Sequence, residues 1–346
     1  MRYGVPYKGS KNALAERLCA AIPHRGFTHF YDLFAGGCAV THRMLFAGGF
    51  QYYHINDLDD AAPRLFLAAV SGKYRDEKRW ISREDFALLK DTDPYVSISW
   101  SFGNNRIDYL YSKEIEPYKR AAHYAIVFGE WEETRRLCPE IAPACETALA
   151  GLTDTKERRI EFGRAAVRWL KANATAETIA ANPLYRSCHL RKANRKECPT
   201  YATPQSLQRL ESLESLQSLG SLESLERLES TTLPYDEVKI EPNSVIYCDP
   251  PYKGMTGYAA GTGKGKRCAT AFDFARFYDW CERQTELVLI SEYEMPADRF
   301  ACVWAAKHLV RCAANVTTHT TERVFTPLRQ KETYERLMKE QTASLF

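Results

Sequence analysis

The sequence lacks the features that mark membrane-bound and exported proteins. None of its apolar runs approaches the roughly 20 residues that a helix needs to cross a membrane. The first residues, Met1-Arg2-Tyr3-Gly4, also lack the apolar stretch of a signal peptide. We therefore expect a soluble intracellular protein with no membrane partner.

Regularly spaced cysteine pairs are missing too. The eleven cysteines are scattered, which favours reduced thiols over a disulfide framework. Several lie in apolar stretches, where we expect them to be buried: Cys19, Cys38, Cys248 and Cys302. Cys188, His189 and Cys198 lie near one another in sequence but have no accompanying CxxC pair, so no metal site is predicted.

A strong charge of either sign is also absent. The 47 basic and 44 acidic residues give a net charge of +3, which neither requires nor excludes a nucleic-acid partner. At 346 residues with 45% hydrophobic content, the chain is long enough for one large domain or two ordinary ones. Function must therefore be sought in individual motifs.

The most informative stretch is Val245-Ile246-Tyr247-Cys248-Asp249-Pro250-Pro251-Tyr252. Its apolar first half predicts a buried parallel strand, which the two prolines end. Asp249 to Tyr252 then lie at the carboxyl end of a strand, where open α/β sheets bind ligands. The Asp249 carboxylate and the Pro250 carbonyl can accept hydrogen bonds from an amine, and Tyr252 can stack on a flat heterocycle. The alternative is a strand followed by an ordinary turn.

Two further patterns indicate a nucleoside-binding sheet. The aromatic strand expected at 27–34 runs into Gly36-Gly37 and then a helix, as in the first turn of Rossmann-type folds. The GxGxxG fingerprint is absent, so the turn suits a nucleoside without a pyrophosphate. About 20 residues further on, a second strand ends at Asp57, which either binds ribose hydroxyls or is a solvated strand end. Tyr7 and Lys11 precede both patterns, on a loop that either reaches a small-molecule pocket or is simply exposed.

Four short motifs occur in this order: Tyr7-Lys8-Gly9-Ser10-Lys11, Phe34-Ala35-Gly36-Gly37, Asn56-Asp57-Leu58-Asp59 and Asp249-Pro250-Pro251-Tyr252. Together they resemble the alpha class of S-adenosyl-L-methionine-dependent DNA adenine-N6 methyltransferases, the Dam-like group. The resemblance covers residues 3–60 and about 240–330 well and the middle of the chain only loosely. Gly37-Cys38 departs from the FxGxG spacing of many methyltransferases, a variation that Dam-like members tolerate.

The resemblance implies an α/β fold: a Rossmann-like methyltransferase sheet with an inserted, mostly helical target-recognition domain. It implies a catalytic domain at 1–60 plus 201–346 and a DNA-binding insertion at 61–200. The residues expected at the cofactor are Tyr7, Lys11, Asp32, Phe34, Gly36, Asp57 and Asp249. Those expected at the target adenine are Asp249, Pro250 and Tyr252.

The implied reaction moves the methyl group of S-adenosyl-L-methionine to the exocyclic amine of an adenine flipped out of double-stranded DNA, without a metal. Double-stranded DNA is the expected partner, while a companion restriction nuclease and the choice between a monomer and a weak dimer stay open. We expect a cytoplasmic protein of bacterial or phage origin. The alternatives are adenine methylation in RNA and an inactive DNA-binding protein that interacts through its leucines. Cytosine-N4 methylation is less favoured, because those enzymes usually carry serine in place of Asp249.

Helical spacing of apolar residues dominates the middle of the chain, most clearly at 61–70, 117–128, 131–141 and 158–170. A glycine-interrupted loop there has groups that match adenine and guanine edges: Asn104, Asn105 and Arg106. A basic stretch supplies side chains that suit phosphates: Arg191, Lys192, Arg195 and Lys196. An ordinary surface turn and a solvated basic face are the respective alternatives.

A leucine recurs at every third position from Leu207 to Leu228. In an α-helix three residues turn about 300°, so eight such leucines spiral around the helix instead of forming one stripe. We expect the segment to pack partly against the catalytic domain, with dimerisation as the alternative. Beyond it, the pattern predicts strands at 230–233, 287–293 and 323–327 and helices at 272–281 and from 331 onward.

Overall fold

The computed structural model describes residues 3–7, 9–190, 202–216, 226–252, 272–313 and 316–343, without the side chains of 189–190 and 308–319. The chain forms two compact units. Residues 1–73 and 215–346 make up the sheet unit, and residues 74–214 make up the helical unit. Within the described ranges, no helix is both long and apolar enough to span a membrane.

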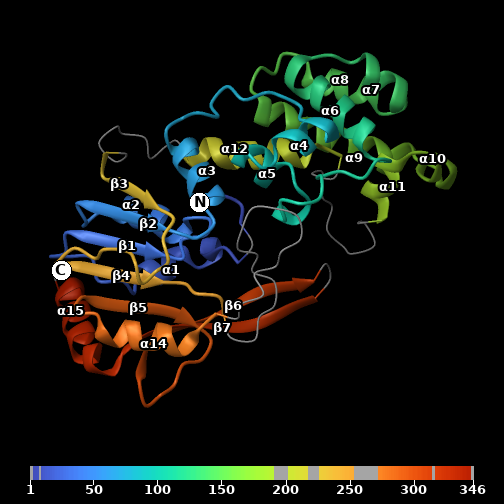
Figure 1. The fold of residues 1–346 in the computed structure, drawn as a ribbon. Helices are drawn as coiled ribbons and strands as arrows, with labels where there is room; N and C mark the ends of the chain where they lie inside the picture. The colour runs from blue at the N-terminus through green and yellow to red at the C-terminus, as the bar shows by residue number, and fades with distance from the viewer. Residues whose placement is uncertain are drawn as a thin grey trace. The chain divides into compact units, whose positions relative to one another are not determined.

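The sheet unit is built on a seven-stranded sheet with the order β3-β2-β1-β4-β5-β7-β6 (Figure 1). Its strands are β1 (His29–Leu33), β2 (Tyr52–Asn56), β3 (Leu228–Thr231), β4 (Ser244–Cys248), β5 (Leu287–Glu292), β6 (Phe300–Ala313) and β7 (Val316–Pro327). β7 is antiparallel to β5 and β6, whereas the other neighbouring strands run parallel. The sheet confirms the predicted Rossmann-like α/β fold.

Helices cover both faces of the central strands. The helices of this unit are η1 (Lys11–Ala13), α1 (Ala15–Cys19), α2 (Ala39–Ala47), α3 (Ala61–Val70), α14 (Phe274–Arg283), η6 (Leu328–Gln330) and α15 (Lys331–Ala343). Phe30 of β1 and its neighbour Val245 of β4 are buried with residues of α1, α2 and α15. The next pair, Tyr31 and Ile246, is buried with residues of α14, because successive side chains of a strand point to opposite faces. β4 is therefore buried on both sides, which is why its apolar run is unbroken.

The far edge of the sheet is a long hairpin that the sequence predicts only in part. The expected strand at 323–327 is the end of β7, while β6 is absent from the prediction. Register shifts between Cys302 and Trp304 and between Arg311 and Ala313 interrupt the two-residue period of β6. Cys302 is exposed beside the first shift, so the expectation that it is buried is wrong. The other three named cysteines are buried free thiols: Cys19, Cys38 and Cys248.

The helical unit consists of helices around an apolar core. They are α4 (Arg83–Leu89), α5 (Pro94–Ser99), η2 (Phe102–Asn104), α6 (Glu116–Phe128), α7 (Glu132–Leu137), α8 (Ala142–Leu149), α9 (Thr155–Asn173), α10 (Ala176–Ala181), α11 (Pro183–Leu190) and α12 (Gln205–Glu214). Ile126, Ile141 and Phe162 are completely buried in this core. The helical spacing in the sequence therefore predicts the character of this part of the chain correctly.

The boundaries of the two units differ from the expected 61–200 insertion at both ends. α3 lies in the sheet unit, where the ring of Phe66 packs edge-on against His42 with 5.5 Å between centroids. α12 lies in the helical unit, where Leu207 joins the core and Glu211 pairs with Arg159 at 2.5 Å. The assignment of a catalytic and a DNA-binding role to the two units stays a prediction.

The leucine repeat divides between the two units. Leu207, Leu210 and Leu213 of α12 are all buried. Three leucines spaced by three cover an arc of about 120°, which a single apolar stripe accommodates, although eight would not fit. Leu207 packs in the core of the helical unit, and the expectation that the repeat packs partly against the catalytic domain stays a prediction. Residues 217–225 lie outside the described residues, and Leu228 begins β3.

Candidate active site

Three neighbouring strands end side by side at the carboxyl edge of the sheet. β1 lies between β2 and β4. From β1 the chain passes to β2 and then β3 on one side, and it crosses to β4 on the other side. The N–H of Asp249 donates to the Leu33 carbonyl at 3.3 Å. The N–H groups of Phe34 and Ala35 donate to the Asn56 carbonyl at 2.9 and 3.0 Å. Such a reversal of strand order is where open α/β sheets bind ligands.

Asp57 holds the glycine turn that follows β1. Its Oδ2 accepts the N–H of Gly36 at 2.7 Å, and its Oδ1 accepts the N–H of Asp59 at 2.9 Å. Phe34 and Gly36 have φ values of 70° and 48°, so the turn is sharp. Burial raises the pKa of Asp57 to about 6, although these backbone hydrogen bonds oppose the rise. The structure thus brings Asp57 to the turn, and its contact with a ribose stays a prediction.

The N-terminal loop lies directly against the same turn. The N–H of Val5 donates to the Gly37 carbonyl at 2.8 Å. The Tyr7 ring covers Gly36 so closely that a Cβ on that glycine would lie 2.9 Å from Tyr7 Cε1. Tyr7 and Gly36, both predicted at the cofactor, are therefore in contact.

A methyl group at Gly4 is expected to destabilise this arrangement. Gly4 has a φ of +68°, its N–H donates to His42 Nδ1 at 2.9 Å, and an added Cβ would lie 2.2 Å from the Gly37 carbonyl oxygen. Gly48 has a similar φ of +69° but nothing within 4 Å of such a Cβ, so Gly48→Ala is the matched control for backbone strain alone. We expect Gly4→Ala to lower the free energy of unfolding by about 1–3 kcal/mol more than Gly48→Ala. Urea unfolding measures the difference, and equal losses would contradict the close packing of the loop.

Lys11, Asp249, Tyr252 and Glu322 meet at the end of β4 and form what we call the strand-end cluster. Lys11 Nζ donates to Asp249 Oδ1 at 2.7 Å and lies 4.7 Å from the centre of the Tyr252 ring. The Tyr252 hydroxyl donates to Glu322 of β7, whose Oε1 lies 3.8 Å from Lys11 Nζ. Pro250, the predicted carbonyl acceptor, is buried beside Asp249. The cluster therefore joins three predicted site residues to one that the sequence analysis missed.

Burial dominates the electrostatics of the strand-end cluster. The side chains of Lys11, Asp249 and Glu322 are only 11%, 18% and 3% exposed. Burial raises the pKa of Asp249 and that of Glu322, and in both cases the Lys11 cation opposes the rise. Two buried carboxylates thus share one nearby ammonium group. Such a site favours a ligand that brings positive charge or hydrogen-bond donors.

Asp32 and Phe34 take up structural positions beneath the turn. Asp32 is 1% exposed, and its Oδ2 accepts hydrogen bonds from the backbone N–H of Thr41 at 3.2 Å and from its hydroxyl at 2.5 Å. It therefore stabilises the first turn of α2. The Phe34 ring packs against Tyr235 and Phe277 at 5.5 and 5.7 Å between centroids. Cofactor contacts of Asp32 and Phe34 stay predictions.

Replacing Asp32 with asparagine is expected to change how stability depends on pH. Burial raises the folded-state pKa of Asp32 from 3.8 to about 7, so the folded protein binds this proton more tightly than the unfolded chain. Between about pH 4 and 7, ionisation of this group costs on the order of 1 kcal/mol of stability per pH unit. Asp32→Asn does not titrate, so its stability relative to the wild type should increase as the pH rises through this range. Urea unfolding at several pH values measures this, and a constant difference would contradict it.

The loop that carries Asn104, Asn105 and Arg106 is internally hydrogen-bonded. Asn105 Oδ1 accepts the N–H of Ile107 and that of Asp108, and its Nδ2 donates to the Asp108 carboxylate at 2.7 Å. Asn105 therefore shapes the loop. Asn104 and Arg106 have positive φ values of 58° and 62°, and contacts of this loop with bases stay a prediction.

Part of the predicted DNA surface cannot be placed. Arg191, Lys192, Arg195 and Lys196 lie outside the described residues. Where the structure describes side chains, no group of three or more His, Cys, Asp and Glu residues is arranged to hold a metal ion. Cys198 and the side chain of His189 are not among those described.

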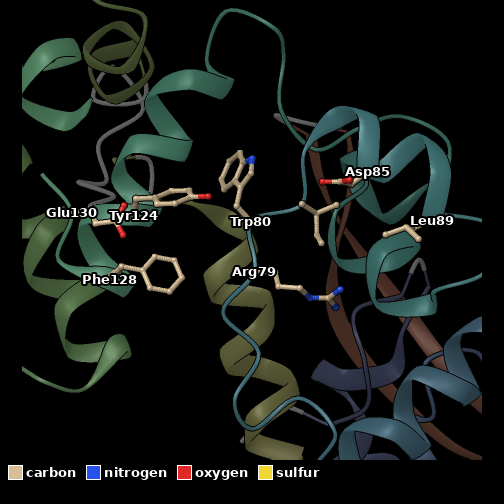
Figure 2. Close-up of a pocket in the computed structure, with 8 residues that line it drawn as sticks. Arg79, Trp80, Asp85, Leu89, Tyr124, Phe128 and Glu130 are labelled. Atoms are coloured by element: carbon tan, nitrogen blue, oxygen red, sulfur yellow. The ribbon is translucent and has the colours of Figure 1, made fainter. Parts of the chain in front are cut away.

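A pocket of about 460 Å³ lies within the helical unit (Figure 2). Its lining is Arg79, Trp80, Ile81, Asp85, Leu89, Tyr124, Phe128 and Glu130. The Trp80 ring is fixed by stacking on Tyr111, with 5.5 Å between centroids and 8° between planes. None of the predicted site residues lines this pocket, and the pocket shares no residue with the strand-end cluster.

The mostly parallel sheet and the glycine turn are consistent with a Rossmann-like methyltransferase fold. Residues 7–126 match the model of the family described as D12 class N6 adenine-specific DNA methyltransferase. This match confirms the resemblance to the Dam-like enzymes and supports adenine-N6 methylation of DNA as the general activity, with S-adenosylmethionine as the methyl donor that such a family implies. The matched range includes Lys11 and Asp57 but ends before Asp249 and Glu322. No curated protein sequence matches the chain.

Glu322 of β7 and Asn56 at the end of β2 lie near the predicted site residues, and the sequence analysis assigned a role to neither. Asn56 Oδ1 accepts the hydroxyl of Thr231 at 2.8 Å and the N–H of Leu233 at 3.0 Å, so it ties the segment after β3 to the end of β2. Glu322 shares a face of β7 with Val324, and both are buried. The residues that flank this pair on the same face are Thr320 and Thr326, so the sequence shows no apolar two-residue pattern in which Glu322 would stand out.

Proposed function

We propose that this chain transfers the methyl group of S-adenosylmethionine to the exocyclic N6 amine of an adenine extruded from double-stranded DNA. The observation that carries the proposal is the position of Asp249. Its carboxylate lies at the strand-order reversal, bonded to Lys11 and next to the Tyr252 ring. An acceptor beside an aromatic ring suits an amine on a flat heterocycle.

The residues around the glycine turn fit the methyl donor. Gly36 and Gly37 both lie against the N-terminal loop, because an added Cβ would be 2.9 Å from Tyr7 Cε1 and 2.7 Å from the Val5 carbonyl oxygen, respectively. The loop and the turn expected at the cofactor are thus packed together. Asp57 at the end of β2 has acceptor oxygens suited to ribose hydroxyls, and the Asp249 carboxylate favours a cation nearby. When bound, the donor supplies an activated methyl group on a sulfonium, which is a strong leaving group.

Asp249 and Pro250 act on the attacking nitrogen. The N6 lone pair is delocalised into the ring, so N6 is a poor nucleophile. By accepting its hydrogens, the Asp249 carboxylate and the Pro250 carbonyl favour tetrahedral character as the new bond forms, which stabilises the transition state more than the ground state. The donor would supply the methyl carbon to the nitrogen and leave as the neutral thioether, and Asp249 would accept the proton that N6 loses.

Tyr252 and the helical unit serve recognition in this proposal. Tyr252 stacks on the extruded adenine, which compensates part of the few kcal/mol that base flipping costs. Asn104 and Arg106 of the helical unit read base edges, while Arg191, Lys192, Arg195 and Lys196 bind phosphates. The major groove of duplex DNA presents such base edges, so the proposal expects a duplex substrate.

Incorporation of tritium from labelled S-adenosylmethionine tests the proposal. Duplex DNA and a structured RNA of equal adenine content are compared, and the proposal expects incorporation into the duplex. Preference for RNA would favour the RNA methyltransferase alternative. Absence of incorporation, together with no S-adenosylmethionine binding by calorimetry, would favour an inactive DNA-binding protein. Sequencing of modified adenines in genomic DNA from an expressing host would then identify the recognition site.

A further inference from the structure

Glu322 occupies an unusual position for an acidic side chain. It lies on β7, the strand antiparallel to β5, and its side chain is 3% exposed. Burying a carboxylate costs several kcal/mol unless hydrogen bonds and opposite charge compensate. Its compensating contacts both belong to the strand-end cluster: the hydroxyl of Tyr252 and the ammonium of Lys11.

The contacts of Lys11 show why a second acid is useful here. Lys11 Nζ bonds Asp249 Oδ1 at 2.7 Å and lies 4.7 Å from the centre of the Tyr252 ring. An amine held by Asp249, with its heterocycle on Tyr252, would compete with Lys11 for both groups. Glu322 Oε1 is only 3.8 Å from the same ammonium, so a shift of about 1 Å gives Lys11 an ionic hydrogen bond there.

We propose that Glu322 is a positioning residue for methyl transfer: it fixes the Tyr252 ring through its hydroxyl and accepts the Lys11 ammonium when the target amine engages Asp249. The inference rests on the proposed function. Lys11 thus remains paired while Asp249 changes partner, and the cation remains in the buried site. No covalent bond changes in this exchange.

Glu322→Gln removes the negative charge of this side chain but keeps its size. Glutamine keeps an acceptor for the Tyr252 hydroxyl but cannot pair with an ammonium as a carboxylate does. Lys11 should then remain on Asp249, so we expect kcat on duplex DNA to fall about 10- to 100-fold. The affinity for S-adenosylmethionine, measured by calorimetry, should stay within about twofold because Glu322 contacts neither Asp57 nor the glycine turn among its hydrogen bonds.

The pH profile distinguishes positioning from a merely structural role. Without the competing carboxylate, Lys11 holds Asp249 more firmly in its ionised form, so the acidic limb of kcat/KM should shift to lower pH. The matched control is Glu292→Gln, which removes another 3% exposed carboxylate, on β5, that accepts the N–H of Tyr293. We expect the control to change stability but leave the acidic limb in place.

The outcomes separate this inference from the proposed function. If the wild type methylates DNA but Glu322→Gln has the same kcat and the same acidic limb of its pH profile, only this inference is overturned. If Glu322→Gln and Glu292→Gln lose the same stability and have the same kcat and the same acidic limb of kcat/KM, Glu322 has only a structural role. That result would also overturn the inference. A wild type that transfers no methyl group would overturn the proposed function as well. A double-mutant cycle of Glu322→Ala with Tyr252→Phe should show non-additive effects on kcat, because each change removes the same hydrogen bond. Additive effects would contradict the hydroxyl contact as a positioning device.

Discussion

Asp249→Ala is expected to lower methyl transfer to duplex DNA by on the order of 10²–10³-fold or more, while DNA retention stays near the wild-type level. The substitution removes the acceptor that the proposal assigns to the N6 amine. It does not remove Tyr252 or any residue of the helical unit. Lys11 keeps a carboxylate within reach, because Glu322 Oε1 lies 3.8 Å from its Nζ. The loss should therefore be concentrated in kcat and not in folding.

The measurement combines tritium incorporation with a filter-retention assay on the same duplex. Asp298→Ala, at an exposed aspartate of the sheet unit, is the control for the loss of one negative charge, and it should behave like the wild type. Asp249→Asn adds a finer comparison, since it keeps one acceptor oxygen but replaces the other with a donor. Wild-type turnover by Asp249→Ala would remove Asp249 from the reaction and with it the central step of the proposal.

The sequence predicts those parts of the candidate site that lie within a recognisable local pattern. β4 is buried on both faces, so its apolar run is unbroken and the prolines mark its end at Asp249. The glycine turn and Asp57 lie about 20 residues apart, which is a consequence of one βαβ unit. The structure accordingly brings Asp57 to Gly36 at 2.7 Å.

Glu322 is harder to predict because its partners are remote in sequence. Its contact with Lys11 depends on β7 entering the sheet next to β5, a strand order that no local pattern determines. α12 illustrates the same limit: its leucines are spaced as the sequence shows, but the core that buries Leu207 is formed by residues of α6, α8, α9 and α11. Periodicity predicts that a face is buried without identifying its partner.

Lys11→Met is expected to have the largest effect on stability. The substitution leaves Asp249 and Glu322, 18% and 3% exposed, without the ammonium they share. Breaking a buried ion pair by removing one partner typically costs about 3–5 kcal/mol. We therefore expect a loss of this order in the free energy of unfolding near neutral pH, measured by urea unfolding.

The pH dependence of this loss has a definite sign. Burial already raises the folded-state pKa of both carboxyl groups, and removal of the Lys11 cation that opposes the rise must raise them further. The folded variant then binds protons more tightly than its unfolded chain, so its stability falls as the pH rises above the unfolded-state value of about 4. The deficit relative to the wild type should accordingly be small in acid and large near neutrality. For the same reason the acidic limb of kcat/KM should move to higher pH, opposite to the shift expected for Glu322→Gln.

The double variant Lys11→Met with Glu322→Gln provides the control. It removes one of the two carboxylates that the single variant leaves close together, so part of the lost stability should return, most clearly near neutral pH. A Lys11→Met protein whose stability deficit is independent of pH, and which Glu322→Gln does not restore, would show that the two acids do not share the lysine. Since the exchange of Lys11 between Asp249 and Glu322 requires that sharing, this measurement on the free protein tests the cluster independently of any turnover.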